Sequence, residues 1–251
     1  VLAQTAEAIE AMRENEDAVD ANAIGEMVSN DPLMTLKVLS YAATHRPARV
    51  VTDTETVTAT LVMMGISPFF RVFGPQPTTA QRLAAHPEAL EGLKEVIQRA
   101  HRGANFALGF AVHRMDPDAP VIHEAALLHD FAEMLLWCHA PSLALRIRQA
   151  QRADPTLRSA AIQQEVLGIQ LADLQQALMK AWRLPELLIR ISDDHHADRA
   201  SVRNVLLAVR LARHTAGGWD NAAIPDDVAD IAALLNLSAG AALQLVRSIE
   251  A

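Results

Sequence analysis

Apolar residues recur at three- and four-residue steps along nearly the whole chain, which is the spacing of amphipathic helices. The clearest case is the stretch Ile122 to Trp137, IHEAALLHDFAEMLLW, where alanine and leucine side chains share one helical face. We expect this stretch to form a buried apolar helix. No segment shows the alternation of a convincing strand, so the pattern predicts an all-α fold with about a dozen helices.

Polar and proline residues mark where several of these helices begin. Asp31 followed by Pro32 is a good N-cap with proline at the first helical position, and Thr52 with Glu55 has the spacing of a capping box that opens another helix. The sequence Gly-Pro-Gln-Pro at 74–77 is the best boundary candidate. We therefore expect an N-terminal helical bundle over 1–74 and a second multi-helix half over 75–251, ending in a short helical extension from about residue 218.

Composition excludes several classes of protein. The chain has 51% hydrophobic residues and only 4% aromatic ones, which favours close-packed helices over sheets. Its formal net charge of −8 and the lack of a compact basic patch argue against a nucleic-acid partner. The single cysteine, Cys138, excludes an internal disulfide and fits a reducing compartment. No apolar run reaches the ~20 residues of a membrane span.

We therefore expect a cytoplasmic protein with no membrane segment and no signal peptide. The chain begins at Val1 rather than at a methionine, which is what a trimmed or partial sequence would show.

The apolar stretch contains one pair that packing would not select, His129 and Asp130. A histidine and an aspartate in a buried wall must be hydrogen-bonded, ion-paired or bound to a metal, because burying them bare is costly. Whether this pair takes part in chemistry decides the class of the protein.

Four segments together resemble the HDOD domain of bacterial signalling proteins, a relative of the HD phosphohydrolases. They are IGEMVSNDPLMTLKVLSYA at 24–42, VTDTETVTATLVMMG at 51–65, EAALLHDFAEMLL at 124–136 and LMKAWRLPELLIRISDDHHA at 178–197. The similarity covers about residues 1 to 217. It implies an all-α fold, with an N-terminal helical bundle packed on an HD-like half, and a regulatory or scaffolding role.

The resemblance also implies where a metal would be held. Catalytic HD proteins use a histidine on an earlier helix, the adjacent His-Asp pair, and an aspartate on a late helix. In this chain His101 falls at the first of these positions and His129 with Asp130 at the second, but Arg210 stands where the late aspartate is expected. A guanidinium cannot ligate a cation. Glu133 likewise replaces the lysine that HD phosphodiesterases place near phosphate.

We interpret these five residues, His101, His129, Asp130, Glu133 and Arg210, as a relict HD pocket. In this interpretation Asp130 pairs with Arg210 or hydrogen-bonds His101, and the old site is a polar contact between helices. We expect no catalytic residue, no metal and no cofactor. If a divalent metal does bind, His101, His129 and Asp130 are its candidate ligands.

Other chemistry-bearing residues have simpler interpretations. His195 and His196 are adjacent on a helix and point about 100° apart, so a helix-terminal role is favoured over shared metal binding. His123 is expected at the surface or at a helix start, and Cys138 as a small buried apolar group. The cluster Phe69, Phe70 and Phe73 is expected in the core between the two halves rather than on an exposed docking patch.

The sequence thus predicts a non-catalytic regulatory or scaffolding domain of bacterial signal transduction that acts through a protein partner. One alternative is a metal-dependent phosphohydrolase or phosphodiesterase with a reduced ligand set. A second is a small-molecule sensor whose ligand occupies the relict HD pocket and shifts the packing of the halves.

Overall fold

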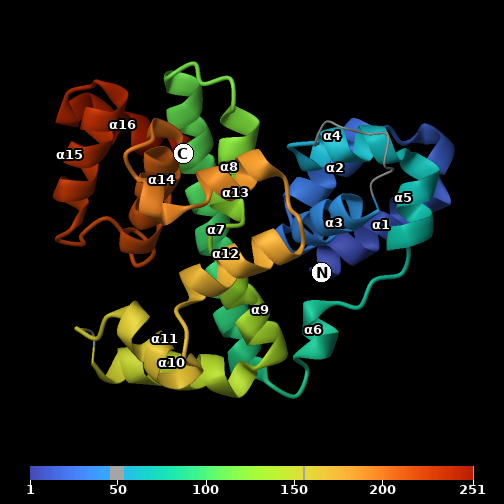
Figure 1. Ribbon diagram of the computed structural model, residues 1–251, viewed down its shortest axis with the longest axis horizontal. Coiled ribbons are helices and arrows are strands. Elements are labelled where there is room, and N and C mark those ends of the chain that lie inside the picture. The colour runs from blue at the N-terminus through green and yellow to red at the C-terminus, as the bar shows by residue number, and fades with distance from the viewer. Residues whose placement is uncertain (46–53, 155, 251) are drawn as a thin grey trace. The chain divides into compact units, whose positions relative to one another are not determined.

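The computed structural model describes residues 1–45, 54–154 and 156–250, and these ranges contain helices and turns but no strand. Figure 1 shows the helices in chain order. The prediction of an all-α fold is confirmed. The chain divides into two compact units, one made of Val1–Ile97 with Asp130–Pro185, the other of Gln98–His129 with Glu186–Ala251. This division does not follow the boundary at residue 74, which stays a prediction about domain organisation.

The first unit begins with a bundle of short helices. Helices α2 and α3 both pack on α4, and α1 contacts α2 and α5. The aromatic cluster of Phe69, Phe70 and Phe73 is buried, with each residue at most 5% exposed, so its predicted burial is confirmed. The helices are α1 (Ala3–Glu14), α2 (Ala21–Ser29), α3 (Pro32–Thr44), α4 (Val57–Met64), α5 (Ile66–Phe73) and α6 (Thr79–Arg82), with the 3₁₀ turn η1 at Glu16–Ala18.

Local chemistry explains where these helices begin. The Asp31 carboxylate accepts hydrogen bonds from the backbone N–H groups of Leu33 and Met34, at 2.9 and 3.0 Å, as expected of an N-cap before proline. The predicted cap Thr52 lies outside the described residues. Helix α4 begins instead after Thr56, whose hydroxyl accepts from the Ala59 N–H at 3.2 Å.

The remainder of the first unit is a second group of helices in which α9 contacts α10, α12 and α3. Trp137 of α9 is 4% exposed and lies so close to Gly92 that a Cβ added there would stand 2.6 Å from its ring. Glycine at 92 is therefore what lets these two backbones approach. The helices are α9 (Phe131–His139), α10 (Pro141–Ala153), α11 (Ser159–Leu167) and α12 (Leu171–Ala181), with the first part of α7 (Pro87–His113).

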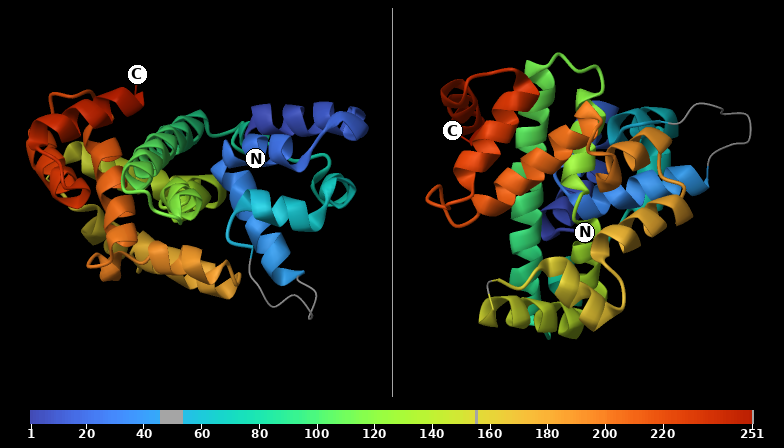
Figure 2. Two further views of the ribbon diagram at one scale, coloured as in Figure 1. Left: turned by 90° about the horizontal axis from the view of Figure 1, so that it is seen from above. Right: turned by 60° about the vertical axis from the view of Figure 1, so that its left-hand side comes forward.

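The second unit is built around α14, which packs on α8, α13 and α15, while α15 packs on α16. Figure 2 shows α14, α15 and α16 side by side in both further views. The helices are α8 (Ala119–Leu127), α13 (Glu186–Ile191), α14 (Ala200–His214), α15 (Ile224–Leu235) and α16 (Ala239–Glu250), with the 3₁₀ turn η2 (Asp194–His196) and the later part of α7.

No single helix within the described ranges has both the length and the apolar character to cross a bilayer. By those two measures alone one bent pair, α15 with α16, qualifies together, with an angle of 98° at its break.

Candidate functional site

The His129–Asp130 pair does not lie inside one long helix. Helix α8 ends at Leu127 and α9 begins at Phe131, so the predicted continuous helix over Ile122 to Trp137 is wrong. The flanking side chains of Leu127 and Phe131 are fully buried, whereas the pair between them is only partly buried. Burying a charged pair in an apolar face is costly, and the helix is interrupted at this pair.

His129 has an acidic partner in its own unit. Its Nε2 lies 3.2 Å from the Asp194 Oδ1, and the His129 side chain is 11% exposed while that of Asp194 is 37% exposed. Asp194 opens the turn η2, where His195 and His196 also lie. The sequence pointed to the acids near 194 as neighbours of a histidine pair, but not as partners of His129.

The two exposed histidines of η2 are held by the preceding aspartate. Asp193 accepts from the His195 N–H at 3.2 Å, and its carboxylate lies 3.2 Å from His195 Nδ1 and 3.8 Å from His196 Nε2. Partial burial opposes ionisation of Asp193, but the hydrogen bonds from His195 and the nearby His196 lower its pKa below the usual range. The histidines thus stabilise a turn, close to the helix-terminal role predicted for them.

Two further histidines, His101 on α7 and His123 on α8, influence each other electrostatically. Burial lowers the pKa of His123, and the nearby His101 lowers it further because two imidazolium charges would repel each other. His123 is in the middle of α8 and only partly exposed, so the expectation of a surface or helix-start position is wrong. Sequence reasoning did not bring these two histidines together, because they lie on different helices, α7 and α8.

Asp130 and Glu133 belong to the other unit. Asp130 occupies the N-cap position of α9 without a side-chain capping bond, and Glu133 is in the first turn, where a carboxylate interacts favourably with the helix dipole. The predicted contact of Asp130 with Arg210 or His101 joins different units and stays a prediction.

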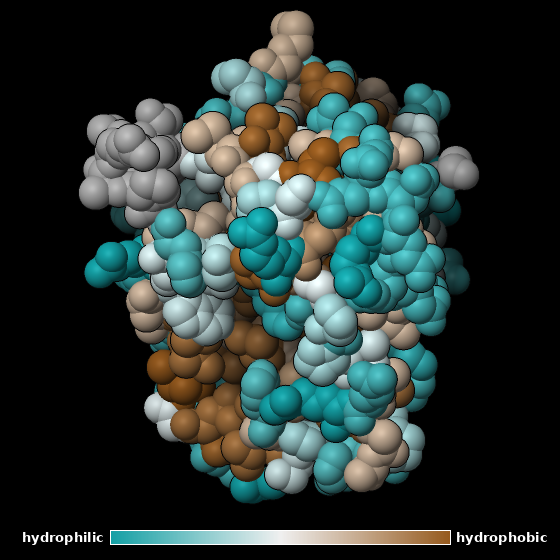
Figure 3. Space-filling model, turned by 90° about the vertical axis from the view of Figure 1, so that its right-hand side faces the viewer, coloured by the Kyte–Doolittle hydropathy of each residue, from teal (hydrophilic) through white to brown (hydrophobic). Residues whose placement is uncertain are grey.

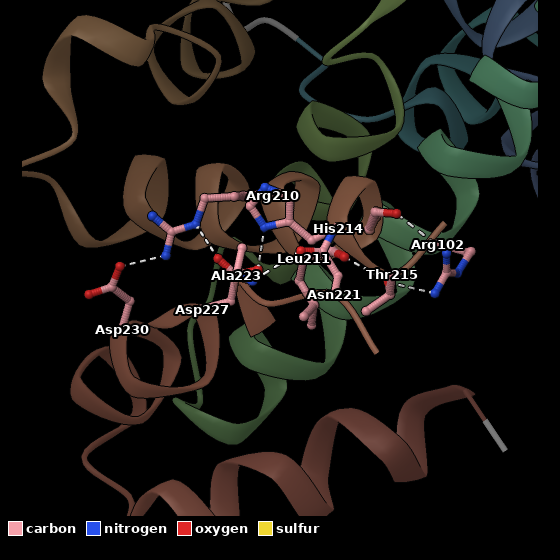
Figure 4. Close-up of polar contacts among 10 residues, drawn as sticks. Arg102, Arg210, Leu211, His214, Thr215, Asn221, Ala223, Asp227 and Asp230 are labelled. Carbon is pink, nitrogen blue, oxygen red and sulfur yellow. Dashed lines mark hydrogen bonds and ion pairs between the residues drawn. The ribbon is translucent and has the colours of Figure 1, made fainter. Parts of the chain in front are cut away.

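Arg210 lies in an acidic cluster that sequence reasoning missed. Its Nε is 2.7 Å from Asp227 Oδ1 and its Nη2 is 2.5 Å from Asp230 Oδ2. His214, one turn along α14, places Nδ1 2.6 Å from Asp227 Oδ2. Figure 4 shows Arg210 and His214 pointing together at Asp227 on α15.

Burial distinguishes the two acids of this cluster. The Asp227 side chain is 3% exposed and that of Asp230 is 47% exposed. Asp227 is therefore a buried carboxylate paired on both oxygens, which is how a buried charge is normally tolerated. The available sequence signal was the proline-led start Ile-Pro-Asp-Asp at 224–227, which marks a helix beginning but not its partner.

A further polar contact closes the same unit. Arg102 of α7 forms an ion pair with Glu250 at the end of α16 and donates to Thr215 Oγ1 at 2.6 Å. Glu250 also accepts from the Trp219 indole N–H at 3.1 Å. The predicted C-terminal helical extension is thus joined to α7 by its last turn (Figure 4 shows the Arg102 end).

Within the described ranges, no three His, Cys, Asp or Glu side chains are grouped so that they could hold one metal ion. Cys138 is a free thiol, 8% exposed. Burial raises its pKa, which disfavours the reactive thiolate.

Solved structures with the same fold are numerous at low sequence identity. The MmoQ response regulator from Methylococcus capsulatus str. Bath is 18% identical, with a TM-score of 0.69 over 93% of this chain and 95% of that one. A virulence factor from Campylobacter jejuni subsp. jejuni is 17% identical, with a TM-score of 0.63 over 94% and 84%. An HDOD domain protein of unknown function from Geobacter sulfurreducens is 13% identical, with a TM-score of 0.50 over 100% and 92%.

The sequence itself was compared with family descriptions and with curated proteins. No curated protein matches it. The description of the HDOD domain matches residues 1–198, most of the chain, and ends just before α14 and Arg210. Together with the segments and the all-helical fold described above, this match establishes that the chain belongs to the HDOD domain family.

Proposed function

We propose that this chain is a non-catalytic regulatory or scaffolding domain of bacterial signal transduction, acting through contact with a protein partner. The observation that carries the proposal is the state of Arg210. Its guanidinium is engaged with Asp227 and Asp230, and the resemblance to HD proteins leads us to expect a metal-binding aspartate at this position in a catalytic relative.

A cation at this position opposes metal-assisted hydrolysis for two reasons. A guanidinium has no lone pair for a metal and would repel a divalent ion nearby. Moreover, its two acids are already engaged, Asp227 by Arg210 and His214 and Asp230 by Arg210, so they are poor substitutes as ligands. A phosphohydrolase needs a metal that polarises phosphate and acidifies a bound water.

The contact made by His129 supports the same conclusion. His129 is held against Asp194, an acid on the turn η2. Such a contact fixes the ring and can serve structure alone. The MmoQ response regulator, by its name a signalling protein, has this fold over nearly its whole length, which favours a signalling context for this chain as well.

Metal content and turnover test the proposal directly. Purified protein should contain far less than one equivalent of manganese, iron or zinc. It should also hydrolyse bis-p-nitrophenyl phosphate and cyclic dinucleotides, with added Mn²⁺ or Fe²⁺, no faster than His129→Ala does. Stoichiometric metal with turnover that is lost in His129→Ala, but kept in the exposed control His86→Ala, would replace the proposal by the phosphohydrolase alternative.

The partner requires a separate experiment. Helix α4 exposes two adjacent apolar side chains, Val62 and Met63, at 62% and 63%, and grouped exposed apolar side chains can mark a protein-contact surface. Crosslinking followed by affinity capture in a bacterial host that encodes the chain should yield a specific signalling protein. Recovery should fall in Met63→Glu and persist in Lys94→Gln, a surface change elsewhere in the same unit. If crosslinking and affinity capture in that host recover no specific partner protein, a scaffolding role is refuted.

A further inference from the structure

The first unit contains a concave groove that the proposed function does not use. It lies between α3, the segment leading into α6, and α9, and it has a volume of about 590 Å³. Its apolar walls are formed by Leu33 and Leu36 of α3, Leu135 of α9, and Trp182 after α12. Figure 3 shows hydrophobic side chains gathered around a hollow on the lower left of one face.

The size of the groove suits a small molecule. Ligand pockets commonly measure about 300–1,000 Å³ and are mainly apolar with a few polar groups that orient the ligand. A protein partner instead needs about 800 Å² of its own surface to be covered, which a single concavity of this kind does not offer. Apolar walls open to water gain free energy when an apolar group replaces that water.

The charges at the groove are of one sign. Lys37 on α3 and Arg82 on α6 both line it, whereas no Asp or Glu does, although the chain has 30 acidic and 22 basic residues. Within the described part of the chain, both cations contact neutral acceptors only. Lys37 Nζ donates to Gln76 Oε1 at 2.6 Å. Arg82 Nε donates to the Cys138 carbonyl at 2.8 Å, and its Nη2 lies 3.0 Å from His139 Nδ1.

Asp31 acts on Lys37 electrostatically, but within the described residues no hydrogen bond or ion pair joins the two side chains. Asp31 is fully buried and already accepts from the N–H groups of Leu2, Leu33 and Met34, so its oxygens are occupied. Burial lowers the pKa of Lys37 more strongly than Asp31 raises it, so the ammonium pays a desolvation cost that a closer anion would relieve. Two cations with spare N–H donors therefore border an apolar hollow.

We propose that this groove binds a small amphipathic anion, with an apolar body against Leu33, Leu36 and Trp182 and one anionic head group at Lys37 and Arg82. The two cations select the anionic head group, and the apolar walls of the groove select the apolar body. An uncharged apolar molecule would leave the two cations without a counter-charge, and a simple inorganic anion would leave the apolar walls wet. The proposal goes beyond the partner-binding role and does not depend on it.

The chain carries its own probes for this site. Cys138 is the single cysteine and lines the groove, and so does Trp182. Titration with sodium decanoate should change the Trp182 fluorescence, with the change lost in Trp182→Phe, and should slow the reaction of Cys138 with a thiol reagent. Decyl phosphate tests whether the head group is a phosphate rather than a carboxylate. Decanol and inorganic phosphate test the apolar and anionic parts separately.

Charge variants decide the proposal. Lys37→Gln and Arg82→Gln should each weaken decanoate or decyl phosphate about tenfold or more, as expected for one charge-assisted hydrogen bond. They should leave the weaker binding of decanol unchanged. Lys180→Gln, on α12 of the same unit and outside the groove lining, is the matched control and should bind as the parent does.

Three results would overturn the proposal. They are no saturable binding of either anionic probe, equal affinity for decanol and decanoate, or affinity unaffected by both Lys37→Gln and Arg82→Gln. Attachment of a bulky maleimide to Cys138 is an independent check, because it should block decanoate without unfolding the chain. If circular dichroism shows the labelled protein folded and decanoate still binds, the site is elsewhere.

Discussion

Asp227 is the residue whose removal best tests the account of Arg210. Asp227→Asn keeps the shape of the side chain and removes its charge. The side chain is 3% exposed and contacts both Arg210 and His214, so the change leaves a buried amide facing two groups that are, or can be, cationic. Asp230→Asn is the matched control, because it contacts the same arginine from the same helix but is 47% exposed.

The expected magnitudes follow from this difference in exposure. Breaking a buried ion pair by removing one partner costs about 3–5 kcal/mol. The Arg210 side chain is 38% exposed and retains Asp230. Part of its charge is therefore still compensated, and we expect Asp227→Asn to lower the free energy of unfolding by about 2–3 kcal/mol. The exposed pair should contribute only about 0–1 kcal/mol, so Asp230→Asn should be nearly silent.

Urea unfolding followed by far-ultraviolet circular dichroism measures both variants, and calorimetry separates the two units if they unfold independently. For a chain of this size the Asp227 effect corresponds to a melting temperature about 4–12 °C lower. Added salt should diminish the Asp230 effect more than the Asp227 effect, because the exposed pair is screened. Equal losses for the two variants would refute the assignment of Asp227 as a buried, stabilising charge.

Three other perturbations test separate parts of the structure. Because the pKa of His123 is lowered from 6.5 in the folded chain, the unfolded chain binds a proton there first as the pH falls below about that value. The free energy of unfolding should therefore fall with acidification. In thermal scans from pH 7.5 to 5, His123→Gln should weaken this dependence of stability on pH. Gly92→Ala should lower the unfolding free energy by about 1–3 kcal/mol, because the added Cβ would press on the buried Trp137 ring, and an unchanged urea midpoint would contradict that packing. Asn204 is fully buried, and neither its Oδ1 nor its Nδ2 has a hydrogen-bond partner within the described residues. Asn204→Leu should therefore raise the free energy of unfolding by about 1–2 kcal/mol. A loss of stability instead would mean that bound water satisfies the amide.

The helices were largely predictable because their signals are local. The N-cap Asp31 depends only on residues within one turn, and it caps α3 where the sequence predicted. The aromatic cluster around Phe70 was predictable for the same reason, since helical spacing puts its members on one face.

Pairings between helices were not predictable in the same way. The partners of Arg210, Asp227 and Asp230, lie on the next helix beyond the loop that follows α14, and nothing near residue 210 specifies them. The break between α8 and α9 was missed because apolar periodicity continues through it and no proline or glycine marks it. The break falls at His129 and Asp130, a charged pair that would be costly to bury bare in an apolar face.

The same physical argument connects that break to the function. An enzyme can keep a charged pair at the centre of its fold because a metal compensates the charge. Here the compensation visible within the second unit comes from protein groups: His129 is held by Asp194, and Arg210 by Asp227 and Asp230. Restoring chemistry would require more than one substitution, because Arg210→Asp would place a third acid beside two that had just lost their cation. Such a variant should be less stable than Arg210→Met, and a stable, metal-binding Arg210→Asp would show instead that the site is one change from an active centre.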